Sequence, residues 1–408
     1  MNFETWEKVG LSKICRIICG ATPSTKVPEY WSNDIKWATA KDVSESNGYK
    51  LYDTERKISK LGFNNCSTEM IPSESTVLIA RGATMGKSCM LGECMAINQT
   101  CYALIPNRKR VNPYFLFYYI KYLSPYFQQI ANGAIFNTVI GSSLRDIQIT
   151  LPPLTIQRRI ADILSALDDK IELNRQTNAT LEAIAQAIFN EWFVDFNFPG
   201  ATGEMVESEL GLIPKGWRVD SILLVAELLS GGTPSTKNNE YWNGDIKWIS
   251  AKDVSSAQGS FVLDTERKIT RLGVKNSNTK ILPKLTTIVT ARGTVGSYCI
   301  LSEPMAMNQT NYGLKAKDQE SDYFVFFSLA NLVAQLQQAS YGTIFDTVTT
   351  ITFEKSKIII PPYFIIWKFD QLVRPLMMTI LGNLEQSNTL SKIRDYILPK
   401  LMNGEIDV

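Results

Sequence analysis

The chain has 408 residues, 45% of them hydrophobic and 10% aromatic, so it can bury the cores of two or more domains. It contains no histidine, which removes the commonest general base and most zinc sites, and its seven cysteines include no Cys-x-x-Cys pair. No run of 18 apolar residues occurs and the opening MNFETWEKVGLSKI has no apolar signal core, so we expect no membrane span and a cytoplasmic location.

The net charge of +2 is unevenly distributed along the sequence. Residues 1–150 carry a net charge of +5 and residues 212–358 carry +3, whereas residues 151–211 carry −6. Basic surfaces suit a phosphate backbone and acidic ones do not. The pattern indicates two mildly basic blocks separated by an acidic segment, with ordinary surface charge as the alternative explanation.

The first block, residues 1–150, mixes short strands such as Thr76–Ala80 with amphipathic helices such as Tyr114–Leu123. It recurs as residues 212–359, where Thr286–Ala291 and Tyr323–Leu336 are the counterparts. The longest match pairs GATPSTKVPEYWSNDIKWATAKDV (20–43) with GGTPSTKNNEYWNGDIKWISAKDV (231–254). Shorter matches pair DTERKISKLG with DTERKITRLG, MAINQT with MAMNQT, and GAIFNTV (133–139) with GTIFDTV (342–348). The chain is therefore a duplication.

A long helix is predicted after each block, beginning behind Leu151-Pro152-Pro153 and Ile360-Pro361-Pro362. In the first helix every seventh position forms one seam, which is apolar except for a single asparagine: Ile160, Leu167, Asn174, Leu181 and Ile188. Neighbouring seam positions are expected at Ile163, Leu164, Ile171 and Ile184. The second helix repeats the spacing at Phe369, Leu376, Asn383, Leu390 and Ile397.

Such a seven-residue repeat requires a partner helix in a coiled coil, and one polar seam residue weakens the packing but fixes the register. We therefore predict an α+β fold in which two duplicated globular domains are joined by two long antiparallel helices forming a coiled coil, with pseudo-twofold symmetry. Asn174 and Asn383 would set the register of the helices. Two unrelated amphipathic helices are the alternative. Residues 198–215 are Gly-rich and acidic, and are expected to form an irregular linker.

Two motifs resemble catalytic loops but lack essential residues. Gly82–Ser88 (GATMGKS) is one residue shorter than a Walker phosphate loop, and its second copy, Gly293–Ser297, has no Lys. Ile360-Pro361-Pro362-Tyr363 resembles the Asp/Asn-Pro-Pro-Tyr loop of adenine methyltransferases, but an isoleucine side chain cannot accept a hydrogen bond from the adenine amino group. We therefore expect a glycine turn and helix-starting prolines, with no catalytic residue, no cofactor and no metal site.

Polar and basic residues recur in the same order in both blocks. Asn and Gln can read adenine, while Lys and Arg read guanine or bind phosphates. The DNA contacts predicted in the first block are Thr22, Ser24, Thr25, Lys26, Lys41, Arg56, Lys57, Arg81, Lys87, Asn98 and Gln99. Those predicted in the second block are Thr233, Ser235, Thr236, Lys237, Lys252, Arg267, Lys268, Arg292, Asn308 and Gln309. For each residue alone, a surface or turn-capping role is the alternative. Core positions rather than base stacking are expected for Trp31, Trp37, Trp242 and Trp248.

A duplicated DNA-reading block on a helical spacer would act as a ruler. A helix of about 36 residues is roughly 54 Å long at about 1.5 Å per residue. The blocks could then enter the major groove on one face of a duplex, about one helical turn apart. The predicted target has two parts and an unread gap, and the two blocks, being alike, should read related sequences on opposite strands.

As a set, these motifs resemble the DNA specificity subunit of type I restriction–modification systems. The resemblance covers nearly the full length and rests on GGTPSTKNNEYWNGDIKW, ARGTVGS with MNQT, LPPLTIQRRIADILSALDDKIELN, NEWFVDF (190–196) and RDYILPKLMNGEI (394–406). It implies two target-recognition domains, residues 1–150 and 216–359, joined by a linker at 198–215. It also implies two spacer helices in a coiled coil, residues 151–197 and 360–408, the latter with the C-terminal segment.

The resemblance also implies partners. Similar proteins bind double-stranded DNA and two methylation subunits, which carry the S-adenosylmethionine chemistry on adenine N6, and recruit two ATP-dependent restriction subunits. By resemblance, Trp192, Phe193 and Leu401 would be apolar anchors for methylation subunits, with an intramolecular core as the alternative. Tyr363–Lys368 departs from the usual Gln-Arg-Arg helix start seen at Gln157–Arg159.

We therefore expect a non-catalytic DNA-recognition and scaffold protein. One rival is a self-contained methyltransferase or nuclease, which cofactor binding to the isolated chain would favour. The other is a protein-interaction scaffold that never touches DNA, which a DNA affinity insensitive to salt and sequence would favour.

Overall fold

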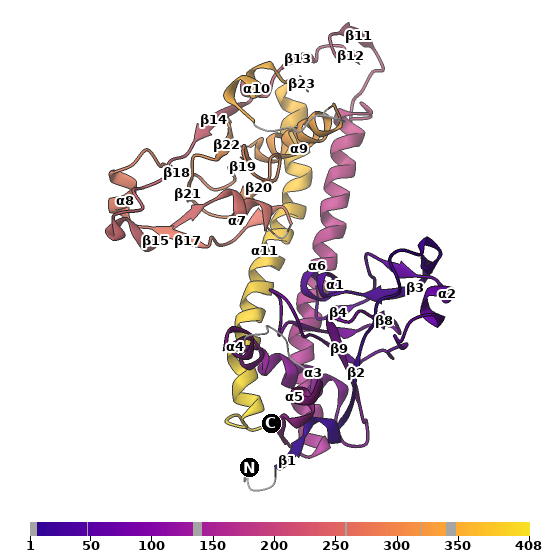
Figure 1. Cartoon of the computed structure of the whole chain (residues 1–408). Helices are drawn as coiled ribbons and strands as arrows, with labels where there is room; N and C mark the ends of the chain where they lie inside the picture. The colour runs from indigo at the N-terminus through magenta and orange to yellow at the C-terminus, as the bar shows by residue number, and fades with distance from the viewer. Residues whose placement is uncertain (1–5, 47, 134–140, 258, 319, 340–347) are drawn as a thin grey trace. The chain divides into compact units, whose positions relative to one another are not determined.

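The computed structural model describes residues 6–46, 48–133, 141–257, 259–318, 320–339 and 348–408. These residues cluster into two compact units, Met1–Leu173 with Ser387–Val408, and Asn174–Gln386. Two helices of 40 residues each, α6 (Leu154–Phe193) and α11 (Tyr363–Met402), contribute one part to each unit (Figure 1). The matching segments 133–139 and 342–348 lie almost wholly outside the described residues.

The first unit is built around a five-stranded sheet. Its strand order is β2 (Cys15–Cys19), β9 (Cys101–Pro106), β6 (Thr76–Ile79), β7 (Ser88–Leu91) and β4 (Lys50–Leu51). A three-stranded sheet lies beside it in the order β5 (Lys57–Ile58), β3 (Trp31–Ala38) and β8 (Ala96–Ile97). β1 (Glu7–Gly10) pairs with β10 (Gln148–Leu151), so the two ends of the block meet just before α6 begins.

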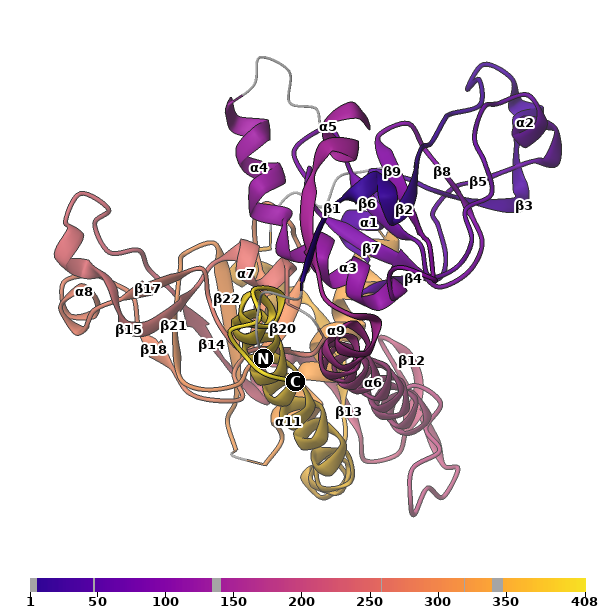
Figure 2. The same ribbon diagram turned by 90° about the horizontal axis from the view of Figure 1, so that it is seen from below.

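Short helices connect the strands of the first unit: η2 (Leu11–Lys13), η3 (Pro28–Tyr30), α1 (Ala40–Glu45), α2 (Lys60–Asn64), α3 (Pro113–Tyr122), α4 (Ser124–Gly133) and α5 (Gly141–Asp146). Local sequence explains the start of several. Thr39 and Asp42 form a capping box at α1, and Asn112 caps α3, whose first residue is the proline favoured at that position. Figure 2 shows α3 between the five-stranded sheet and α6, where Phe115 and Leu116 enter a core with Ile160 and Leu164 of α6.

The second unit repeats this arrangement. Its five-stranded sheet has the order β14 (Ala226–Ser230), β22 (Asn311–Ala316), β19 (Thr287–Thr290), β20 (Tyr298–Leu301) and β16 (Phe261–Val262). The smaller sheet has the order β17 (Arg267–Ile269), β15 (Trp242–Ile249), β21 (Met305–Met307) and β18 (Ile281–Leu282). β13 (Arg218–Ser221) pairs with β23 (Lys357–Ile360) before α11 begins.

The helices of the second unit also match their counterparts: η4 (Ile222–Leu224), η5 (Asn239–Tyr241), α7 (Ala251–Ser255), α8 (Arg271–Lys275), α9 (Asp322–Ala339) and α10 (Thr350–Lys355). The α+β class, the duplication, both long helices and the helix-starting prolines are therefore confirmed. None of the helices that the structure describes has both the length and the apolar character needed to cross a bilayer.

The segment 198–215 is not irregular throughout, as the sequence had suggested. Its second part is a hairpin of β11 (Met205–Ser208) and β12 (Gly211–Pro214), paired in antiparallel register from Met205↔Pro214 to Ser208↔Gly211. Gly211 has φ +93°, a conformation that only glycine adopts easily, and it allows the tight turn. The Gly and Glu content of this segment hid a strand signal only four residues long.

Within each unit the two long helices pack antiparallel. In the first, Arg159 of α6 donates to the backbone oxygen of Val408 at 3.1 Å, and Asp168 pairs with Arg394. In the second, the Asn178 amide donates to the Ile380 carbonyl at 3.3 Å. The predicted pairing of the helices is confirmed inside each unit.

The second seam position is four residues after the first, at Leu164, Ile171, Asn178 and Ala185. The prediction was wrong for Ile163 and Ile184, which are 40% and 44% exposed, because each lies one residue before that position. Leu164 and Ala185 are fully buried.

Four amides form a ladder across the seam of the second unit. Asn174 Nδ2 donates to Gln386 Oε1 at 2.9 Å and to the Asn383 backbone oxygen at 3.3 Å. Asn383 Nδ2 donates to Asn178 Oδ1 at 2.8 Å. Asn174 and Asn178 are 2% and 5% exposed, so a shifted register would leave buried amides unpaired. This geometry fits the register role predicted for Asn174 and Asn383, and it adds Asn178 and Gln386, which the sequence did not single out.

Candidate nucleic-acid interface

A tryptophan pair supports the duplicated motif in each block. Trp31 and Trp37 meet edge to face with ring centroids 5.3 Å apart, and the Arg56 guanidinium lies 3.7 Å above Trp31. The second block repeats this with Trp242 and Trp248 at 5.2 Å and Arg267 at 3.6 Å above Trp242. Such stacking contributes about 0.5–2 kcal/mol each. The tryptophans are therefore structural, as predicted, and both arginines have one face occupied.

The indole N–H groups of these tryptophans hold the polar loop that precedes them, residues 22–26 in the first block and 233–237 in the second. Trp37 donates to the Ala21 carbonyl at 3.0 Å and Trp31 to the Ser24 carbonyl at 3.3 Å. In the second block the same bonds reach the carbonyls of Gly232 and Ser235, at 3.0 and 3.1 Å. The side chains that this anchoring leaves exposed are Ser24, Thr25, Lys26, Ser235, Thr236 and Lys237.

A Thr–Gln pair joins each loop to the turn before the next strand. The Thr22 hydroxyl donates to Gln99 Oε1, and the Thr233 hydroxyl donates to Gln309 Oε1. Both glutamines are exposed, and this bond leaves their NH₂ groups as outward donors.

The neighbouring asparagines have an internal role. Asn98 is 8% exposed, and its Oδ1 accepts from the Thr100 backbone N–H at 3.1 Å and from the Thr100 hydroxyl at 2.7 Å. Asn308 bonds Thr310 in the same way, at 3.1 and 2.9 Å. Both asparagines close a turn, which is the alternative that the sequence left open. Base reading by either would require this turn to open.

Arg81 and Arg292 lie at the same edge of the sheet as the Thr–Gln pairs. The residue before each bonds the turn that carries the glutamine: Ala80 N–H donates to the Thr100 carbonyl at 2.8 Å, and Ala291 N–H to the Thr310 carbonyl at 2.9 Å. Each arginine opens a glycine turn between two antiparallel strands, which confirms the interpretation preferred over a phosphate loop. Lys87, at the end of the first turn, is exposed with its amine 3.5 Å from the Ser44 carbonyl.

The predicted cations divide into paired and free groups. Lys41 pairs with Glu55 at 2.8 Å and Lys252 with Glu266 at 2.6 Å, and these hydrogen bonds raise the pKa of both lysines. Lys57 and Lys268 pair with Asp53 and Asp264 at 3.1 and 3.7 Å. Within the described residues, no carboxylate pairs with Lys26, Lys237, Arg81 or Arg292, which makes these four the cations most available to a phosphate.

We name the recognition edge of a block as its polar loop, its Thr–Gln pair and its arginine turn. In the first block it comprises Thr22–Lys26, Gln99 and Arg81–Lys87, and in the second Thr233–Lys237, Gln309 and Arg292–Ser297. It presents amide donors, hydroxyls and cations without a buried acid–base pair or nucleophile. The described residues contain no group of three His, Cys, Asp or Glu side chains placed to hold a metal ion. Exposed cations, hydroxyls and amide donors suit the binding of a polyanion.

Buried carboxylates hold each block on its helices. In the first unit Asp168 of α6, 4% exposed, accepts from the Tyr118 hydroxyl of α3 at 2.8 Å and pairs with Arg394 of α11. Burial beside these groups raises the pKa of Tyr118 and lowers that of Lys121, whose amine is 3.9 Å from Asp168. One carboxylate thus joins three helices.

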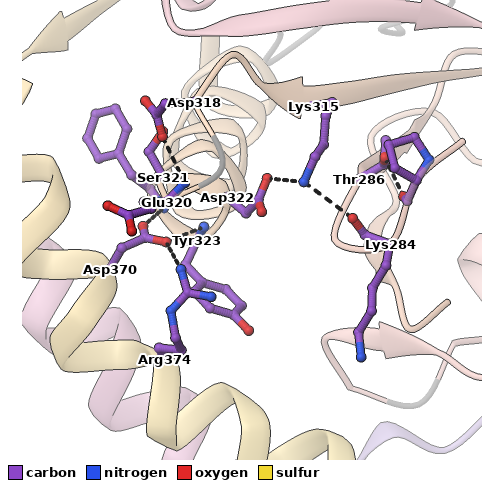
Figure 3. A network of polar contacts seen from close by, with 12 residues as sticks. Lys284, Thr286, Lys315, Asp318, Glu320, Ser321, Asp322, Tyr323, Asp370 and Arg374 are labelled. Carbon is purple, nitrogen blue, oxygen red and sulfur yellow. Dashed lines mark hydrogen bonds and ion pairs between the residues drawn. The ribbon is translucent and has the colours of Figure 1, made fainter. Parts of the chain in front are cut away.

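The second unit uses a different carboxylate for the same task. Figure 3 shows Asp370 of α11 facing the first turn of α9, where it accepts from the N–H of Phe324 at 2.8 Å and of Tyr323 at 3.3 Å. Arg374 lies 3.5 Å from Asp370. Asp370 is fully buried, and burial raises its pKa to about 7. In the first unit the neutral Gln157 sits near the start of α3, accepting from Asn112 N–H at 2.8 Å.

The predicted apolar anchors are internal. Trp192 and Phe193 are 9% and 5% exposed and belong to the core of the second unit with Phe369, while Leu401 is 1% exposed in the core of the first. The intramolecular alternative is therefore the one observed.

Residues 3–183 and 214–373 both match the family model described as "Type I restriction modification DNA specificity domain". The chain belongs to this family. It is 30% identical to the type I restriction enzyme MjaIX specificity subunit of Methanocaldococcus jannaschii, over 99% of this chain and 94% of that protein. It is 28% identical to the HindI specificity subunit of Haemophilus influenzae, over 74% of this chain and 79% of that protein.

The crystal structure of a type I restriction–modification S subunit from M. genitalium shares the fold of this specificity subunit. The two have a TM-score of 0.60 and 12% identity, with coverage of 97% of this chain and 96% of that one. As a member of a family of specificity subunits, the chain is a non-catalytic component, and the predicted family is confirmed.

Proposed function

We propose that this specificity subunit binds a two-part DNA target with an unread gap, each block reading one half-site through its recognition edge. The observation that carries the proposal is the recurrence of three parts of that edge: a Thr–Gln pair, a tryptophan-anchored loop and an arginine without a carboxylate partner among the described residues occur at the same sheet edge in both blocks. Because the contacts are alike, the half-sites should be related sequences on opposite strands.

Each segment of the chain has its own proposed role. Residues 1–150 and 216–359 recognise the target, residues 151–197 and 360–408 provide the spacer helices, and residues 198–215 connect the halves. Methylation and restriction subunits would assemble on this scaffold and supply all catalysis. The start of α11, Tyr363–Lys368, lacks the Gln-Arg-Arg sequence found at Gln157–Arg159, and this difference would change the surface that a partner subunit contacts. Tyr363 and Phe364 are 51% and 56% exposed at the start of α11, where α6 has Leu154 and Thr155, so α11 offers a partner an exposed aromatic surface.

Methylation mapping tests the proposed function directly. The chain is co-expressed with its neighbouring methylation subunit in a methylation-free host, and the DNA is sequenced for N6-methyladenine. One two-part motif with a fixed gap is expected. A soluble complex without methylation would favour the scaffold without DNA contact, and methylation by this chain alone would overturn the absence of a catalytic site.

Replacing Arg292 with alanine in the complex is expected to weaken binding to the mapped target several-fold and to lower the slope of log affinity against log salt by about 1. The reason is the loss of one free cation at the recognition edge. Lys215→Ala removes the same charge from a residue already paired with Glu204 at 2.8 Å in the hairpin, and should leave the slope unchanged. Equal salt slopes for Arg292→Ala and the unmodified complex would remove Arg292 from the contact surface.

A further inference from the structure

The polar loops of the two recognition edges have the same sequence, TPSTK, whereas the segments that follow these loops differ at several positions for reasons internal to the fold. Asn238, which replaces Val27, accepts from the Glu240 N–H at 3.1 Å and caps η5. Asn243 adopts φ +60°, where asparagine is favoured. Gly244 is required because a Cβ there would lie 2.5 Å from the Ile269 carbonyl oxygen. These substitutions serve the fold of the second block.

The arginine turn is the exception. The first block has Arg81-Gly82-Ala83-Thr84-Met85-Gly86-Lys87, and the second has Arg292-Gly293-Thr294-Val295-Gly296-Ser297, one residue shorter and without the lysine. Both turns are closed in the same way: Ile79 N–H donates to the Lys87 carbonyl at 2.9 Å, and Thr290 N–H to the Ser297 carbonyl at 2.9 Å. The glycines at the two ends of each turn all have positive φ, between +83° and +91°.

The extra residue therefore changes the side chains that the turn exposes, while the backbone hydrogen bond that closes the turn stays the same. Met85 is 3% exposed and packs into the core, Thr84 is half-buried, and Ala83 is exposed. Lys87 is exposed, whereas Ser297 in its place is partly buried and its N–H donates to the Thr290 hydroxyl at 3.0 Å. The first turn therefore has an exposed charged donor, with its amine 3.5 Å from the Ser44 carbonyl, at a position where the second turn has a partly buried serine.

We propose that this turn determines how the two half-sites differ. The inference rests on the proposed function, since it assigns specificity within the same edge. Lys87 can only donate hydrogen bonds, so a base that it reads must offer acceptors in the major groove, such as O6 and N7 of guanine. The shorter, lysine-free turn of the second block would not make this contact.

Exchanging the turns tests the proposal. In one variant residues 82–87 (GATMGK) are replaced by GTVGS, and in the reciprocal variant residues 293–297 receive GATMGK; each is co-expressed with the methylation subunit and its N6-methyladenine motif is mapped. The first exchange should convert the first half-site toward the second and make the motif symmetric, with the gap unchanged. The reciprocal exchange should convert the other half-site.

Lys87→Ser provides the conservative variant, and should relax the base preference at one position of one half-site only. A motif left unchanged by both exchanges and by Lys87→Ser overturns the role of the turn, as does a wild-type motif that is already symmetric. A wild-type complex that directs no two-part methylation overturns the proposed function instead, so the two failures are distinguishable.

Discussion

Replacing Asp168 with alanine is expected to lower the free energy of unfolding of the first unit by about 3–5 kcal/mol. The substitution leaves the Arg394 guanidinium, whose side chain is 15% exposed, without its buried carboxylate, and the Tyr118 hydroxyl without its acceptor. Removing one partner of a buried ion pair leaves a desolvation cost, which the exposed Asp395 offsets only in part. Urea denaturation of the full chain would measure the change.

Two further variants separate the buried pair from ordinary surface charge. Asp395→Ala removes the other carboxylate of Arg394, at 2.8 Å, but its side chain is 60% exposed and should contribute less than about 1 kcal/mol. Asp168→Leu combined with Arg394→Met replaces both charges with apolar groups and should recover most of the loss. If Asp168→Ala and Asp395→Ala prove equally mild, Asp168 does not hold the three helices together.

The second unit is expected to lose stability as the pH rises from about 4 to about 7. Burial raises the pKa of Asp370 from its ordinary 3.8 to about 7, and burial also raises that of Asp322 in spite of Lys315 at 2.7 Å. The folded state therefore holds protons that the unfolded chain releases in this range. The stabilisation is complete below the unfolded pKa and disappears as the pH passes the folded one.

The absence of histidine makes this effect visible, because few other side chains titrate between pH 5 and 8. Asp370→Asn keeps an oxygen that can accept from the N–H groups of Phe324 and Tyr323 but cannot ionise. It should flatten the pH dependence, and at pH 8 the variant should be more stable than the wild type by up to a few kcal/mol. Glu320→Gln, an exposed position nearby, is the control and should leave the profile unchanged. Parallel pH profiles for Asp370→Asn and wild type would show that Asp370 is already ionised throughout this range.

The features predicted correctly from the sequence are those with a repeating or local signal. The duplication, the two long helices and the tryptophan cores each rest on many residues at a fixed offset, so no single exception obscures them. The hairpin Met205–Pro214 was missed because two four-residue strands give too short an alternation to detect. Ile163 and Ile184 were misplaced because a helix seam allows either of two adjacent positions until the partner helix is known.

The candidate site was predictable only in outline. The repeat located the polar residues, but whether a cation is free depends on a partner distant in sequence, as with Lys41 and Glu55, 14 residues apart. Asn98 and Gln99 are adjacent and equally polar, yet one is buried in a turn and the other is exposed. Asp168 and Asp370 gave no signal, because a single carboxylate on an amphipathic helix is ordinarily exposed.

The way the chain is shared between the units has a consequence for its synthesis. The second unit is one continuous segment, Asn174–Gln386, whereas the first needs Ser387–Val408 to complete a core that includes Leu398 and Leu401. A ribosome adding about 5–20 residues per second takes roughly 10–40 s between the end of the first segment and the start of the last. The half of the protein made first is thus the half that closes last. The apolar surface of α6 in the first unit therefore remains exposed until the last turns of α11 have been synthesised.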